Sequence, residues 1–156
     1  MRGFFHLQSP QDLLHKLERD YTALQQSPAD VDIAFNFFVT AEHLPDWLAR
    51  TGPQFLKGQR INAFKKAHPL TRICAHLANG GKHLQPRSEH DSVAATGHNG
   101  VFDAGVFEPG VVEEWLTVDL TPRERQLLGQ DTLDVRTLAG QVLAFWQDHC
   151  REVSAP

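Results

Sequence analysis

The segment from Ile33 to Val39 constrains this chain most, because it is apolar on nearly every side of the helix that it predicts. Among its residues only Asn36 is polar. A helix of this kind is stable when its neighbours cover it all round, which predicts a central position in a helical bundle. The chain has 156 residues, 41% hydrophobic and 22% charged, which is enough apolar material for the core of one domain.

Helices, including the one that contains this segment, are predicted where apolar residues recur every three or four positions. They cover the ranges 10–26, 31–51, 55–68, 69–84, 122–129 and 131–151. Ser9-Pro10-Gln11-Asp12 is predicted to start the first helix, with a capping serine, a proline at the first helical position and an acid in the first turn. Thr121-Pro122-Arg123-Glu124 is predicted to form a capping box at the start of the fifth. Pro45 is expected to kink or to end the second helix.

Residues 85–120 differ from the rest, because Gly, Ser, His and Pro replace the helical period. Short β-type runs at 92–96, 101–103 and 113–120 predict a small antiparallel sheet at about residues 90–120, with a turn at 97–100. The expected fold is therefore mainly α: a bundle of four to five helices, forming one domain over residues 1–156, with residues 85–120 as a β-containing insertion.

Two stripes of polar side chains run along the predicted second and fourth helices. Spacings of three, four and seven residues place side chains on one helix face. The stripes consist of Asp32, Asn36, Thr40, His43 and Trp47, and of Arg72, His76, Asn79 and His83. Because a buried polar group without a partner costs about 1–3 kcal/mol, the two stripes are expected to face one another. The alternatives are a buried network that only fixes helix register, or two ordinary solvated faces.

At these residues the chain resembles a known group of proteins. The stretches from Phe35 to Trp47 and from Ile73 to His83 look like a set of uncharacterised bacterial and phage helical proteins. That set is similar to the HEPN superfamily, whose helical bundles dimerise and often act as metal-independent ribonucleases or toxins. The resemblance covers roughly residues 9–84 and the last helix. It implies a HEPN-like bundle and a homodimer formed through the fourth helix.

The resemblance also implies candidate catalytic residues. HEPN ribonucleases carry an arginine, a polar residue and, after three further positions, a histidine. Asn79 and His83 match the last two, but the arginine position is Ala78. A ribonuclease would then use His83 to move a proton, Asn79 to orient the imidazole, and Lys82 or Arg72 to stabilise charge on the phosphate.

The first-ranked hypothesis is a binding module rather than an enzyme, because binding needs nothing that the sequence lacks. The ligand would be RNA, a nucleotide or a toxin- or antitoxin-type protein. Candidate binding residues, in addition to those named as catalytic, are Asn36, Thr40, His43, Asp46, Trp47, Arg72 and His76. A third possibility is a structural protein in which the polar stripes are only a hydrogen-bond network.

Several other classes are not favoured. No metal or cofactor is predicted, because the histidines lack the His-Glu-x-x-His or paired Glu-x-x-His spacing of helical metal sites. Cys74 and Cys150 are expected to be free and buried. A formal net charge of −4 gives no basic field for duplex DNA. No membrane span or signal peptide is predicted, and the cytoplasm is the expected location.

Overall fold

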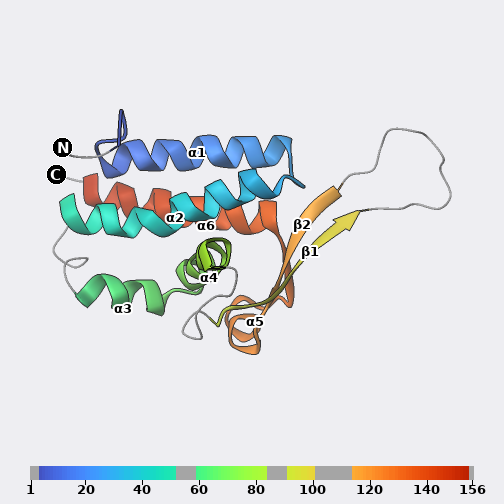
Figure 1. The fold of residues 1–156 in the computed structure, drawn as a ribbon. Coiled ribbons are helices and arrows are strands. Elements are labelled where there is room, and N and C mark those ends of the chain that lie inside the picture. Colours follow the sequence, from blue (N-terminus) through green and yellow to red (C-terminus); the bar gives the residue numbers. More distant parts are fainter. Residues whose placement is uncertain (1–3, 52–58, 84–90, 101–113, 155–156) are drawn as a thin grey trace.

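Three long helices lie side by side and form the main layer of the molecule (Figure 1). They are α1 (Pro10–Gln26), α2 (Val31–Thr51) and α6 (Val135–Ser154). A fourth, α4 (Pro69–His83), packs beneath α2 and α6 and is seen end-on where the others run across the view (Figure 1). The short α3 (Gln59–Ala67) precedes it. This computed structural model describes residues 4–51, 59–83, 91–100 and 114–154.

The core lies where α2 meets α1, α4 and α6. Phe37 is fully buried, and Trp146 of α6 is 1% exposed. The prediction that α2 is central is therefore confirmed. The prediction that it is covered on every side is wrong, because Phe35 is 41% exposed and Asn36 is also exposed. One strip of α2 near its first turns thus stays open.

The start of α1 follows the sequence pattern closely. The Asp12 backbone N–H donates to Ser9 Oγ over 3.1 Å, and the Ser9 backbone N–H donates to Asp12 Oδ2 over 2.9 Å. The Ser9 hydroxyl also bonds this carboxylate, and these contacts lower the pKa of Asp12. Pro45 does not end α2, which continues through it to Thr51. Proline removes only one intrahelical hydrogen bond, and Pro45 is buried here.

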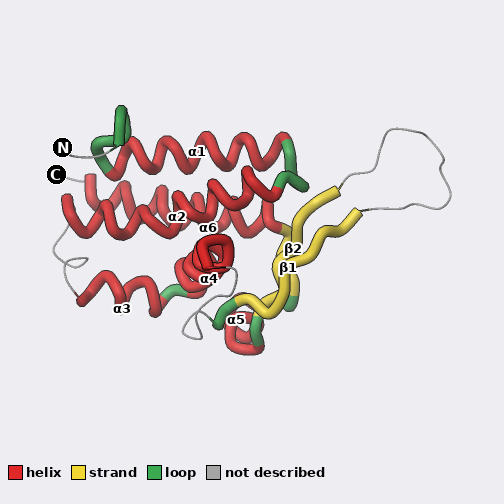
Figure 2. Tube along the Cα trace, in the orientation of Figure 1, coloured by secondary structure: helices red, strands yellow, loops and turns green. Residues whose placement is uncertain are grey.

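A three-stranded antiparallel sheet stands at one end of the helices (Figure 2). Its order is β1 (Val93–Gly100), β2 (Glu114–Leu120) and β3 (Thr132–Asp134). The predicted turn at 97–100 is wrong, because these residues continue β1 and pair with residues 114–117 of β2. The strand predicted at 101–103 lies outside the described residues. The third strand is β3, which was assigned to the last helix because three residues are too few to show alternation.

The expected fold class is confirmed at its coarser level: mainly helical, with a small antiparallel sheet. The described part contains six helices, where four to five were expected for the bundle; the seven-residue α5 (Pro122–Leu128) after β2 lies in the range 122–129 that the sequence predicts as helical. A HEPN-type bundle remains a prediction. Within the described ranges, no helix is long and apolar enough to cross a membrane.

Candidate functional site: a groove between α2, α4 and β1

The polar stripe of α2 does not face α4. Thr40 is buried against α1, where its hydroxyl accepts a hydrogen bond from Lys16 Nζ over 2.8 Å. It also lies 2.9 Å from Asp20 Oδ2. Helices α2 and α4 do pack together, as predicted, but through other residues: Ala41 and Pro45 line the narrow space between them together with Cys74. The expected meeting of the two stripes is therefore wrong at Thr40, because α1 supplies its partners.

His43 and Asp46 belong to a polar cluster that also includes Glu42 of α2 and Lys65 of α3. Lys65 Nζ lies 3.0 Å from both the Glu42 and the Asp46 carboxylates. His43 Nδ1 lies 3.3 Å from Glu42 Oε2, and the His43 side chain is 57% exposed. Potential ligand atoms of Glu42, His43 and Asp46 lie within 4.8 Å of one another, so they are the residues that could hold a metal. The Lys65 ammonium already binds both carboxylates. Trp47 is half-buried against the core.

Arg72 forms the most buried ion pair of the described residues. Its Nε donates to Glu124 Oε1 and its Nη2 donates to Glu124 Oε2, both over 2.7 Å. The Glu124 side chain has no exposed surface. The Ser92 hydroxyl donates to the same carboxylate over 3.1 Å. The predicted capping box is therefore wrong, because Glu124 binds Arg72 and Thr121 makes no side-chain cap bond. Arg72 is consequently not available as a cation for substrate phosphate.

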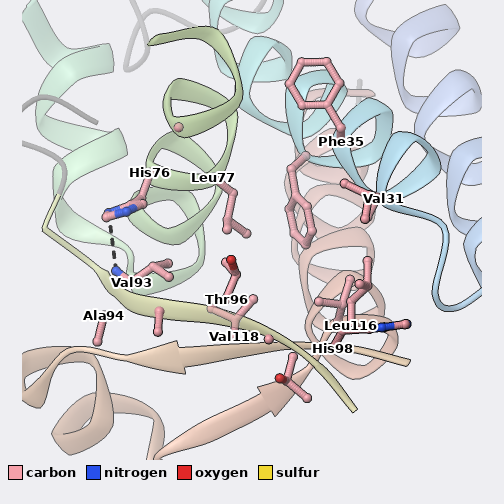
Figure 3. Close-up of a pocket in the computed structure, with 17 residues that line it drawn as sticks. Val31, Phe35, His76, Leu77, Val93, Ala94, Thr96, His98, Leu116 and Val118 are labelled. Carbon is pink, nitrogen blue, oxygen red and sulfur yellow. Dashed lines mark hydrogen bonds between the residues drawn. The ribbon is translucent and has the colours of Figure 1, made fainter. Parts of the chain in front are cut away.

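His76 joins α4 to the first residues of β1. Its Nδ1 lies 3.3 Å from the backbone nitrogen of Ser92 and 3.4 Å from that of Val93 (Figure 3). Because Nδ1 accepts these N–H groups, this contact requires the neutral imidazole with its proton on Nε2. His76 is thus placed at the boundary between α4 and the sheet.

The candidate catalytic residues occupy the last turns of α4, which extends to His83. The Asn79 amide donates to the Ala75 carbonyl over 2.7 Å and is half-buried. The side chains of Lys82 and His83 lie outside the described part of the structure. Their roles therefore remain predictions.

The described residues enclose an open groove of about 640 Å³ between the two helices and the sheet (Figure 3). Leu77 extends into it from α4, and β1 runs along its other side (Figure 3). Its lining is mostly apolar and carries no Asp, Glu, Lys or Arg: Val31, Ala34, Phe35, Phe38, His76, Leu77, Gly80, Val93, Ala94, Ala95, Thr96, Gly97, His98, Leu116, Thr117, Val118 and Val135. Sequence reasoning missed this groove because it assigned the apolar face of α2 wholly to the core.

Neither cysteine contributes a reactive group. Cys74 and Cys150 are free and buried, as predicted. Burial raises the pKa of the Cys150 thiol to about 11 and raises that of Cys74 further. Since the thiolate is the nucleophile, both thiols stay protonated and unreactive near neutral pH.

Comparison of this chain with protein-family models, with curated proteins and with solved structures finds no match.

Proposed function

We propose that this chain is a non-enzymatic helical binding module that holds an apolar segment of a partner protein in the groove between α2, α4 and β1. The supporting observation is the groove itself. It is open, about 640 Å³ in volume and lined mainly by apolar side chains. Its rim includes Val31, 65% exposed, and Phe35, 41% exposed. Apolar surface concentrated in a concavity marks a binding site far more often than scattered exposed residues do.

The electrostatics of the groove favour a protein partner over RNA or a nucleotide, the other ligands that the sequence suggested. Phosphate binding relies on Lys and Arg, and neither residue type is among the described residues that line the groove. The chain as a whole carries a formal charge of −4. Single-stranded RNA is bound by grooves that combine cations with stacking aromatics, and this groove offers the aromatic part alone.

The test is selection of random nonapeptides displayed on phage against the immobilised full chain. Phe35→Ser should weaken binding of the selected peptides at least ten-fold. Leu127→Ser is the matched control, because Leu127 is 58% exposed on α5 and does not line the groove. Equal loss of binding in both variants, or in neither, would overturn the proposal, as would the absence of any selected peptide.

The second candidate is a metal-independent ribonuclease at the end of α4. It is favoured by one observation: the helix runs unbroken through His83, which keeps Asn79, Lys82 and His83 within one regular element. Lys82 is left as the candidate cation, since Glu124 holds Arg72. Cleavage of a single-stranded oligoribonucleotide that His83→Ala abolishes would establish this activity. Equal cleavage by the variant would exclude it.

The resemblance to HEPN proteins adds the proposal that two copies associate through α4. Light scattering on the full chain at micromolar concentration tests this association. A dimer mass supports it, and a monomer mass across that range overturns it.

A further inference from the structure

We propose that the partner segment binds as an added β-strand along the free edge of β1, with a basic residue at the end that lies beside the start of α2. This inference rests on the proposed function. It specifies the backbone conformation and the charge pattern of the segment that the groove accepts.

The first argument is the position of β1 in the sheet. The order β1-β2-β3 leaves β1 at the edge, paired on one side with β2. Six consecutive residues of β1, from Val93 to His98, line the groove, together with Leu116, Thr117 and Val118 of β2, so the groove runs along β1 and extends over the neighbouring strand. At about 3.3 Å per residue the six residues of β1 span about 20 Å, which matches a strand of typical length.

The second argument is that, beyond the start of β1, none of the described residues gives this edge the usual protection. Edge strands in natural proteins are blunted by lysine, proline, short length or a covering element. Residues 94–99 are Ala, Ala, Thr, Gly, His and Asn, and all six are exposed. A register irregularity between Val93 and Ala95 and the His76 contact with Ser92 and Val93 cover only the start of the strand.

The third argument is the wall opposite β1. Leu77 of α4 points toward the strand across the groove, whereas Phe35 of α2 lines the groove with its ring turned away from the strand (Figure 3). Successive side chains of an added strand point to opposite sides, so every second one would face this apolar wall. Backbone hydrogen bonds to β1 would supply affinity, and the wall would select apolar residues at alternate positions.

The fourth argument is the charge at one end of the groove. The Leu116 N–H donates over 3.3 Å to the carbonyl of Pro28, which brings β2 against the start of α2. Asp30 and Asp32 lie at that start, and Glu114 lies two residues before Leu116. Asp30 Oδ1 already accepts the N–H groups of Asp32 and Ile33, and Glu114 Oε2 lies 3.3 Å from His98 Nε2. Asp32 is therefore the carboxylate offered to a basic residue, which would follow the apolar part of the bound segment.

The experiment uses peptides selected as described above, with hydrogen–deuterium exchange of the full chain. Binding should slow exchange of backbone amides within residues 94–99. N-methylation of alternate peptide amides should weaken binding at least ten-fold in one register and little in the other. Selected sequences should alternate apolar residues and carry Lys or Arg at one end, and Asp32→Asn should lower affinity about three-fold at low salt.

Each other outcome has a distinct meaning. Peptides that depend on Phe35 but leave amides 94–99 unprotected, or that tolerate N-methylation in both registers, would overturn strand addition and leave the proposed function intact. Failure to select any peptide would overturn both. Protection of residues 94–99 that grows with protein concentration, together with a dimer mass, would instead assign the edge to a second copy of the chain.

Discussion

The polar face and the apolar face of α4 differ from what the sequence predicts, because contacts within the chain engage the polar face and one end of the apolar face is partly open. On one face Arg72 is sealed by Glu124 and His76 is engaged by the backbone of β1. On the other, Leu77 and Gly80 line an open groove. Arg72 and His76 therefore hold the sheet to the bundle, whereas Leu77 remains partly accessible in the groove and Ile73 is buried in the core. A polar stripe on a helix indicates where partners are needed, and those partners can come from the chain itself.

The sealed face should be the most sensitive to substitution. Glu124→Ala leaves the Arg72 guanidinium buried without its carboxylate, which should lower the free energy of unfolding by about 3–5 kcal/mol. Denaturant unfolding followed by circular dichroism measures this loss. A loss below about 1 kcal/mol would show that solvent reaches the pair.

A double variant separates charge from packing at the same place. Arg72→Met with Glu124→Met removes both charges and keeps apolar volume, so it should recover most of the stability lost in Glu124→Ala. If the double variant is as unstable as the single one, the contact depends on its hydrogen bonds to Ser92 and Lys66 and not on charge balance.

The open face should respond differently, and two phenylalanines of α2 test this contrast. Phe37 has no exposed surface, so Phe37→Ala should cost about 3–5 kcal/mol through lost burial and a cavity. Phe35 lines the groove, and Phe35→Ala should cost less than about 1 kcal/mol. Thermal or chemical unfolding of the two variants measures the difference. Equal costs would mean that Phe35 belongs to the core.

Lys65 should have an intermediate effect. Its replacement in Lys65→Met leaves the Glu42 and Asp46 carboxylates close together without a cation, which should lower the free energy of unfolding by about 1 kcal/mol. The exposed neighbour Lys66 provides the control, because Lys66→Met should change stability by less than about 0.5 kcal/mol. If high salt restores the free energy of unfolding of the Lys65→Met variant, repulsion between the two carboxylates is the cause of its loss.

The smallest expected effect depends on pH and involves His68. Its ring lies 4.6 Å from the Phe64 ring and 5.2 Å from the Phe145 ring, measured between centroids. Burial, together with His149 and Arg72, lowers the pKa of His68 below its ordinary value. The unfolded chain therefore takes up the proton first as pH falls below about 6.5, and the folded state loses stability.

Substitution of this histidine isolates its contribution. Between pH 7.5 and 5.5, His68→Gln should flatten the fall in unfolding free energy by about 1 kcal/mol or less. Near pH 8 His68 is neutral in both the folded and the unfolded state. The difference in unfolding free energy between wild type and variant should therefore not change with pH there. Parallel pH profiles for wild type and variant would contradict the assignment.

Local signals in the sequence predicted much of the fold. The Ser9–Asp12 cap, the helical period of α1, α2, α4 and α6, and the buried free cysteines are all observed. Each depends on residues that are close together in the chain or share one periodic face. Packing of α2 against α4 was also predicted, although Ala41, Pro45 and Cys74 line the narrow space between them, not the polar stripes.

The candidate site was harder to predict because its contacts are distant in sequence. Arg72 and Glu124 are separated by 52 positions, and nothing local distinguishes Glu124 from the acid of a capping box. Exposure of Phe35 likewise depends on which elements pack around the start of α2, and its spacing along the helix does not show this. Spacing identifies which side chains share a face, but it does not identify what covers that face.

The junction between β3 and α6 has a consequence for the energetics of binding. Asp134 ends the strand and Val135 begins the helix, with no loop residue between them. The Asp134 carboxylate accepts the N–H groups of Arg136 and Thr137, which fixes the first turn. Val135 also lines the groove. One wall of the groove is therefore continuous with α6, the last helix of the chain. Because this wall is already fixed, less conformational entropy is lost when the proposed partner segment binds, and its affinity is higher for that reason.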